Sequence, residues 1–101
     1  MDPDLSDFLI ADVVVSAAGR DTDGWYYVVA TDDEFLYLAN GKNRGIDKPK
    51  KKKRKHTLKV LRSETRVAEK LRNGDKVLNS ELRRDLAYLS REMQSNDLGG
   101  F

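Results

Sequence analysis

The chain has 101 residues, of which 36% are charged and 39% belong to the apolar set AVILMFWYC. This length fits one small domain and excludes a barrel enzyme or a dinucleotide-binding domain with a second, substrate-binding domain. The chain has no cysteine, which excludes disulfides and thiolate metal sites, and its single histidine, His56, excludes a site that needs two imidazoles.

Acidic and basic residues occupy different parts of the chain, although the net charge is only +2. Residues 1–41 hold nine acids and one base, residues 42–59 hold ten bases and one acid, and residues 60–101 hold eight bases and seven acids. Such segregation bears on binding partners more than on the fold. The segment 1–7 is acidic, unlike a secretory signal, and no apolar window approaches about 18 residues. We therefore expect a cytoplasmic protein without a membrane span.

Short β-branched and aromatic segments follow one another over residues 8–61. Turn formers crowd residues 19–24, and Asp32-Asp33 is typical of a hairpin turn. The expected strands are residues 9–17, 25–31, 35–39 and 57–61. In the first of them, Ala11, Val13, Val15 and Ala17 are predicted to share one face, with Asp12 and Ser16 on the other. Strands of this length and spacing indicate a small barrel or sandwich.

The last 40 residues change to helical periodicity. Ser63 can cap a first helix, Gly74 is a stop signal, and a second helix is expected to begin near Asn79. We expect a helical extension over residues 62–94 and a flexible tail over residues 95–101. The second helix carries an apolar stripe that either covers an open face of the barrel or pairs with another chain: Leu82, Leu86, Leu89 and Met93.

The segment 42–56 is strongly basic, and residues 50–55 are six consecutive cations. Because these charges repel one another, we expect an extended and mobile loop. A dense array of phosphates offsets the repulsion, since each neutralised phosphate releases condensed counterions. The expected RNA contacts are Lys42, Arg44, Lys48, Lys50, Lys51, Lys52, Lys53, Arg54, Lys55 and the adjacent His56. Other interpretations are a solvated loop, contact with anionic lipid, and a nuclear import signal.

The turn between the first two expected strands contains a second candidate contact. Gly19 directly follows a strand and Gly24 directly precedes one, which favours positive φ or close backbone approach. Arg20 is the only base in the first 41 residues. It either contacts a phosphate or base edge, or pairs with Asp21 or Asp23.

Residues 12–29 resemble a KOW motif, which is a strand, a glycine-bearing loop and a second strand within an SH3-like barrel. Gly19 matches the motif glycine, and Arg20 and Asp21 match the residues after it. Residues 40–44 and 48–56 are similar to the turn and basic loop of small bacterial KOW-domain RNA-binding proteins. These are related to the archaeal and eukaryotic ribosomal protein families fourteen-e, six-e and twenty-seven-e.

This resemblance covers about residues 9–60 and implies binding of RNA, above all ribosomal RNA, without catalysis. Many relatives have a basic residue shortly after the motif Gly-Arg-Asp, where this chain has Thr22 and Asp23. That departure moves the expected main contact to the basic segment 42–56.

Aromatic residues beside the motif turn offer a further contact. Trp25 and Tyr26 fall on opposite faces of the second expected strand, so one of them can stack on an unpaired base. Alternatively, Trp25 and Tyr27 fill the small core, or Trp25, Tyr26 and Tyr37 form a cage for a methylated cation. The sequence predicts no metal, no cofactor and no catalytic site, because it shows neither a complete calcium loop nor a nucleophile with a base.

The sequence thus predicts a mainly β protein: an SH3-like (KOW) antiparallel barrel over residues 8–61 with a C-terminal helical extension. The predicted function is non-catalytic RNA binding, with the ribosome as a possible partner. The alternative is a protein-interaction module that acts as an adaptor for a transcription or translation factor and docks through the barrel and the helical stripe. A helix-turn-helix is disfavoured because the connector, residues 73–80, is long.

Overall fold

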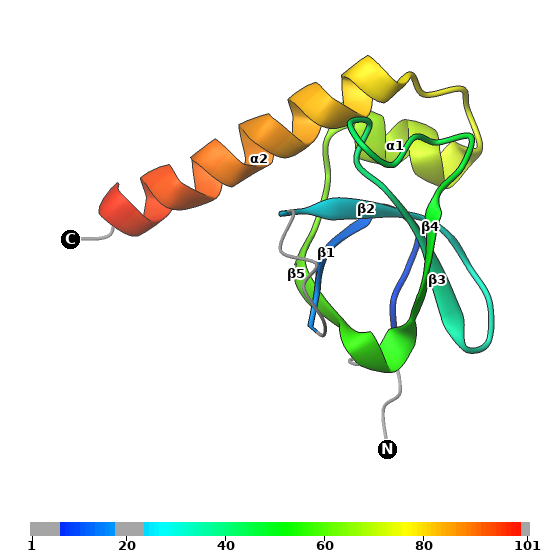
Figure 1. Ribbon diagram of the computed structural model, residues 1–101. Coiled ribbons are helices and arrows are strands. Elements are labelled where there is room, and N and C mark those ends of the chain that lie inside the picture. Colours follow the sequence, from blue (N-terminus) through cyan, green and yellow to red (C-terminus); the bar gives the residue numbers. More distant parts are fainter. Residues whose placement is uncertain (1–6, 18–23, 100–101) are drawn as a thin grey trace.

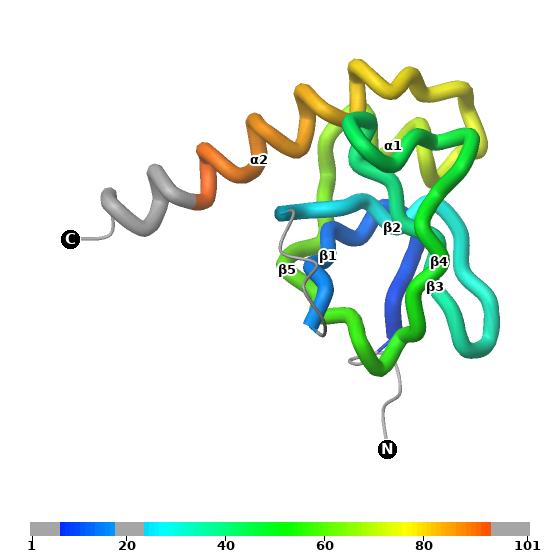
Figure 2. The backbone as a smooth tube through the Cα atoms, viewed as in Figure 1, coloured from blue at the N-terminus to red at the C-terminus, as the bar shows by residue number. Residues whose placement is uncertain are grey.

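The computed structural model describes residues 7–17 and 24–99, and of residues 94–99 the backbone alone (Figure 1, Figure 2). The strands are β1 (Asp12–Ser16), β2 (Tyr26–Thr31), β3 (Phe35–Ala39), β4 (Lys50–Lys53) and β5 (Thr57–Arg62). The helices are the 3₁₀ helix η2 (Arg54–His56) and the α-helices α1 (Arg66–Asn73) and α2 (Asn79–Gly99). Among the described residues, none of these helices is both long and apolar enough to cross a membrane.

The five strands form one antiparallel sheet in the order β4-β3-β2-β1-β5. The three-residue helix η2 connects the two edge strands, so the sheet curls until its edges approach each other at that end (Figure 1). Helices α1 and α2 lie together on one side of the sheet, and α2 extends past it (Figure 1). The structure confirms a small, curled antiparallel sheet with a C-terminal helical extension.

Both faces of the sheet are buried at its centre. The face under the helices carries one core cluster, which consists of Ala11, Val13, Tyr27, Ala39, Val67, Ala68, Val77, Leu82 and Leu86. The opposite face carries a second cluster, which consists of Val14, Tyr26, Val28, Leu36 and Leu38, with Phe8 packed against it. Removal of this apolar surface from water on two sides is the main favourable contribution to folding.

Strand β1 bears out part of the predicted division of faces, because Ala11 and Val13 lie in the cluster under the helices and Val14 lies in the opposite cluster. Asp12, which was expected on a polar face, is fully buried. The second face is not polar here because β1 is covered on both faces, where apolar runs replace a polar–apolar pattern. The register with β5 also shifts between Val13 and Val14.

The buried Asp12 carboxylate is paired, as a charge removed from water requires. Its Oδ2 lies 3.2 Å from Lys59 Nζ and accepts a 2.9 Å hydrogen bond from the Leu9 backbone N–H. Lys59 Nζ also donates to the backbone oxygen of Asp7 at 2.7 Å. This arrangement holds residues 7–9 against β5.

Helix α1 is capped by Thr65, whose Oγ1 accepts from the Ala68 N–H at 3.2 Å. The prediction of Ser63 as the cap is wrong, because Ser63 is buried and bonds to the Tyr27 hydroxyl. The helix ends, as predicted, at Gly74, whose φ of 78° is left-handed. Helix α2 begins at Asn79 as predicted but continues to Gly99, past residue 95, where the sequence predicts a tail.

The apolar stripe of α2 covers the sheet. Leu82 and Leu86 are buried in the cluster under the helices, and Leu89 packs partly against it. Met93, farther along the helix, is 36% exposed. Of the two predicted roles for the stripe, covering the sheet is confirmed for its first half.

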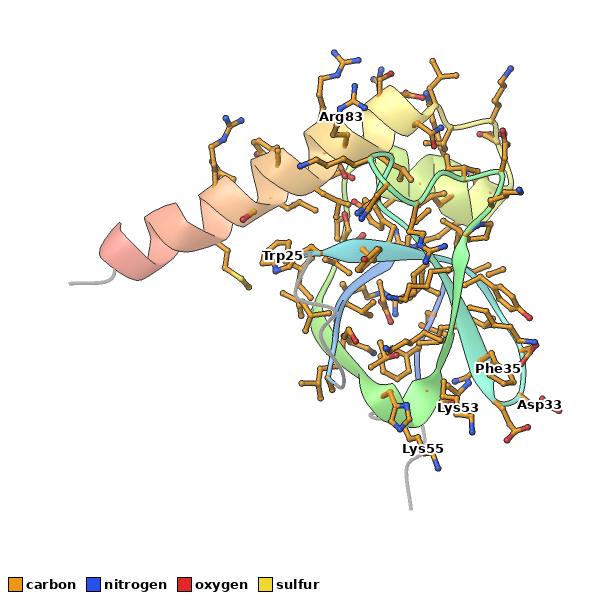
Figure 3. The ribbon with its side chains drawn as sticks, in the orientation of Figure 1. Trp25, Asp33, Phe35, Lys53, Lys55 and Arg83 are labelled. Atoms are coloured by element: carbon orange, nitrogen blue, oxygen red, sulfur yellow. The ribbon has the colours of Figure 1, made fainter. Side chains whose placement is uncertain are left out.

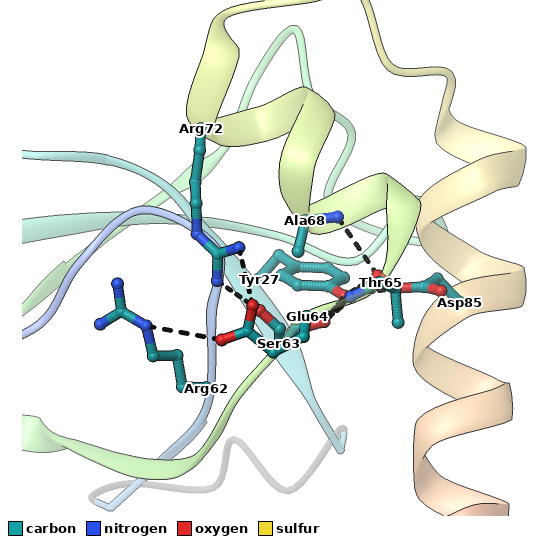
Figure 4. A network of polar contacts seen from close by, with 8 residues as sticks. All are labelled: Tyr27, Arg62, Ser63, Glu64, Thr65, Ala68, Arg72 and Asp85. Carbon is teal, nitrogen blue, oxygen red and sulfur yellow. Dashed lines mark hydrogen bonds and ion pairs between the residues drawn. The ribbon is translucent and has the colours of Figure 1, made fainter.

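The Tyr27 hydroxyl is the centre of a polar network between the sheet and both helices (Figure 4). It donates a hydrogen bond to Asp85 Oδ2, and it lies 2.8 Å from Ser63 Oγ and 3.3 Å from Thr65 Oγ1. Thr65 Oγ1 also donates to Asp85 Oδ2 at 2.8 Å. Burial raises the pKa of Tyr27 well above its ordinary value of 10.0, and the Asp85 carboxylate raises it further.

We expect Tyr27→Phe to lower the free energy of unfolding by about 1–3 kcal/mol, because it leaves buried polar groups without their partner. Above about pH 10, unfolded wild-type chain releases the Tyr27 proton, whereas the folded protein retains it. The stability advantage of wild type over Tyr27→Phe is therefore complete below pH 10 and shrinks as the pH rises. Urea unfolding between pH 7 and 11 measures both effects, and parallel pH curves for the two proteins would contradict the second.

A close approach of backbone to backbone requires Gly41 to be glycine. Its φ is 75°, and a Cβ there would lie 2.1 Å from the backbone oxygen of Asn79. We expect Gly41→Ala to lower the free energy of unfolding by at least about 2 kcal/mol. Gly24→Ala is the matched control, because Gly24 has a φ of 98° but no described residue lies within 4 Å of its Cβ position. Equal losses of stability in urea unfolding would show that φ alone, and not the contact with α2, explains the effect.

Candidate nucleic-acid interface

The lysine run lies mostly in a strand. Residues Lys50–Lys53 form β4, which pairs with β3 so that Lys50 lies opposite Leu38 and Lys53 opposite Phe35. The prediction of a mobile loop is therefore wrong for residues 50–53. Edge strands tolerate lysine because only one side of the backbone is paired and the charges discourage pairing with other chains.

Strand geometry divides these lysines between two faces. Lys50 and Lys52 are half-buried and lie opposite Leu38 and Leu36 of the second core cluster. The Lys50 Nζ is 5.9 Å from the centroid of the Tyr26 ring, and burial lowers the pKa of Lys50. Both side chains are thus only partly open to solvent.

The other two lysines of β4 are exposed on the opposite face. Lys51 lies across from Tyr37, and Lys53 lies across from Phe35. The Lys51 Nζ is 4.3 Å from the centroid of the Phe35 ring. Figure 3 shows Phe35, Lys53 and Lys55 at the end of the sheet that is distant from the helices.

Arg54 stabilises the fold, and part of its guanidinium is bound to the protein itself. Its Nε and Nη2 donate to the backbone oxygen of Asp32 at 3.0 and 2.8 Å. Its backbone N–H donates to the backbone oxygen of Glu34 at 3.0 Å. Arg54 thus fastens η2 to the β2–β3 turn, and its guanidinium has fewer donors left for phosphate. Lys55 and His56, on the same helix, are exposed.

The loop before β4 is held by Asn40, whose role the sequence analysis missed. Asn40 Oδ1 accepts from the backbone N–H of Lys42 at 2.9 Å and of Arg44 at 3.0 Å, and its Nδ2 donates to Asn43 Oδ1 at 2.8 Å. The Asn40-Gly41 pair is a recognisable signal for such a turn. The loop is ordered by these bonds, and it presents Lys42, Arg44 and Lys48 to solvent.

An acidic turn, which connects β2 and β3, lies next to β4 and η2. The Asp32 carboxylate accepts hydrogen bonds from the backbone N–H of Phe35 at 3.0 Å and of Glu34 at 3.1 Å, and from the Tyr37 hydroxyl at 2.9 Å. These bonds lower the pKa of Asp32, the one from Phe35 most strongly, and the Asp32 carboxylate raises the pKa of Tyr37. Asp32 therefore builds the turn, while Asp33 and Glu34 are exposed at its tip.

The residues around the motif turn divide into three groups. Gly19, Arg20 and Asp21 lie outside the described residues, so the expected contact by Arg20 is not placed. Tyr26 is 1% exposed, so the prediction that it stacks on a base is wrong: its ring fills the second core cluster. Trp25 is half-buried and lines a cleft next to α2.

Comparison with known proteins adds no relative: a scan against protein-family models and a search of curated proteins both find no match.

The roles of Arg54 and Lys55 can be separated by stability. Arg54→Gln removes two charge-assisted hydrogen bonds to the Asp32 oxygen, and we expect it to lower the free energy of unfolding by about 1 kcal/mol. Lys55→Gln is the matched control and is expected to change stability by less than about 0.5 kcal/mol. Urea unfolding of both variants is the measurement, and equal midpoints would contradict a structural role for Arg54.

Proposed function

We propose that this protein binds RNA without catalysis, through cations presented by β4, by η2 and by the loop that leads into β4. One observation carries the proposal: six exposed cations project from a short, ordered segment, and within residues 7–17 and 24–93 none of them forms an ion pair. They are Lys42, Arg44, Lys48, Lys51, Lys53 and Lys55. We call these six residues the cationic edge.

The cationic edge suits phosphates because the backbone that carries its charges is ordered. Alternate residues of a strand lie about 6.6 Å apart, so the Cα atoms of Lys51 and Lys53 have a fixed spacing. Each phosphate that they neutralise releases counterions, and this makes binding strong at low salt. Such contacts set position and orientation on the RNA without reading its sequence.

The finer assignment is part of the same proposal: an SH3-like barrel of the KOW type in a cytoplasmic protein, with ribosomal RNA as the leading ligand class. The motif resemblance over residues 12–29 and the curled antiparallel sheet support it. The alternative, a protein-docking module, has less support. Leu82 and Leu86, half of the apolar stripe that would dock a partner, are buried in this protein's own core.

The triple variant Lys51→Gln, Lys53→Gln and Lys55→Gln tests the cationic edge. We expect weaker binding to a labelled RNA hairpin, with the slope of log K against log salt shallower by roughly 2 if all three side chains contact phosphate. The melting temperature should change little, because these side chains are exposed. Fluorescence anisotropy at several salt concentrations measures the affinity, and circular dichroism measures the melting temperature.

The control removes the same charge elsewhere: Arg66→Gln, Lys76→Gln and Arg91→Gln, all at exposed positions on or beside the helices. This variant should keep most of the affinity. Equal losses in the two triple variants would show that net charge alone drives binding, and the absence of saturable binding by the wild-type protein would overturn the proposed function.

A further inference from the structure

A cleft of 330 Å³ lies where the start of β2, the loop after β3 and helix α2 meet. Its size is at the lower end of the range for small-molecule sites in proteins. Figure 3 shows Trp25 at the start of β2, beside α2, and Arg83 on that helix. The cleft is lined by Gly24, Trp25, Asn40, Lys42, Arg83, Leu86, Ala87 and Ser90.

Trp25 provides the apolar surface of this cleft. Part of its indole packs against the core cluster under the helices, and the side chain as a whole is half-buried. The preceding Gly24 has no side chain, and no described residue lies within 4 Å of its Cβ position. A large, rigid aromatic group on the wall of a cleft is suited to stacking on a planar ligand.

Two cations complete the cleft. Arg83 Nη1 donates to the Gly41 backbone oxygen at 3.0 Å, which places the guanidinium at the cleft while other N–H donors stay available. Lys42 is exposed, and its backbone N–H is held by Asn40 Oδ1 at 2.9 Å. No carboxylate belongs to the described lining. With Trp25, Lys42 and Arg83 in its described lining, the cleft favours an anionic ligand with a flat ring.

We propose that this cleft binds one unpaired nucleotide of the RNA, with the base stacked on Trp25 and its phosphate bound by Lys42 and Arg83. This inference rests on the proposed function and names the class of RNA: a loop, bulge or single strand whose bases can leave the stack. Bases inside a continuous duplex cannot reach Trp25. The cationic edge supplies affinity for phosphates, and the cleft selects RNA with an accessible base.

The test uses two RNA hairpins with the same stem: one has a loop of four adenosines, and the other has four abasic sites in that loop. Both carry the same number of phosphates, so they differ only in bases available for stacking. Stacking on an aromatic side chain is expected to strengthen binding of the adenosine loop by about 10-fold. Anisotropy of end-labelled hairpins measures this ratio on the full-length protein.

Trp25 is the only tryptophan of the chain, so intrinsic fluorescence reports on this cleft directly. We expect the unlabelled adenosine-loop hairpin to quench it and the abasic hairpin to leave it nearly unchanged. Trp25→Leu, which keeps an apolar side chain against the core, should abolish the 10-fold preference while retaining salt-dependent binding to both hairpins. Lys42→Gln should weaken binding to both hairpins equally. It should also make the slope of log K against log salt shallower by about 0.7.

The outcomes separate the two proposals. Equal binding of both hairpins by wild-type protein, or equal quenching by both, overturns the nucleotide site and leaves the proposed RNA binding intact. No binding of either hairpin overturns both. If Trp25→Leu does not fold, the fluorescence quenching and the hairpin preference of the wild-type protein test the nucleotide site. Trp25→Phe is then expected to retain part of the preference for the adenosine-loop hairpin.

Discussion

The hydrogen bonds of the Tyr27 hydroxyl fix where the helices sit, and the other functional positions depend on this placement. Tyr27 belongs to β2 in the middle of the sheet, and its bond to Asp85 reaches helix α2 across 58 residues of sequence. Its contacts with Ser63 and Thr65 join the end of β5 to the start of α1. One buried phenol thus connects the sheet, the cap of one helix and the side of the other.

The position of α2 in turn shapes the loop that leads into β4. Asn79 Oδ1 accepts from the Ile46 N–H at 2.9 Å, and Arg83 donates to the Gly41 oxygen at 3.0 Å. Glu81 stabilises the same end of α2: its Oε1 accepts from the Leu78 N–H, and this bond, with the nearby Lys70 ammonium, lowers the pKa of Glu81. The helical extension is therefore part of the candidate RNA site, although it lies outside the segment that resembles a KOW motif.

Local patterns were enough to predict where most elements lie, and long-range contacts decide the rest. Alternating and β-branched residues located β2, β3 and β5, and Gly74 located the end of α1. The lysine strand β4 could not be predicted, because four lysines have little intrinsic preference for a strand and the pairing with β3 determines their conformation.

The same limit applies to individual site residues. Arg54 stands among five lysines in the sequence. Its role in holding the fold comes from its hydrogen bonds to the backbone oxygen of Asp32, which is 22 residues away in the sequence. The sequence pattern did not indicate Arg83 as a site residue. Its place in the same cleft as Trp25 and Lys42 depends on how α2 packs against the sheet. Tyr26 and Trp25 are neighbours with similar side chains, and which of them is buried depends on which face of β2 meets each core cluster.

Placing lysines in a strand, and not in a mobile loop, bears on the energetics of the proposed RNA binding. A flexible loop loses backbone and side-chain entropy when it binds, whereas the backbone of β4 is already ordered by its pairing with β3. The strand also separates the charges by exposure: Lys50 and Lys52 are half-buried, while Lys51 and Lys53 are exposed. Asp33, at the tip of the adjacent turn in Figure 3, and the neighbouring Glu34 are exposed acids that repel phosphates. A bound RNA backbone is therefore expected to pass along β4 and the loop at 42–48, which leads toward the Trp25 cleft, and to avoid the β2–β3 turn.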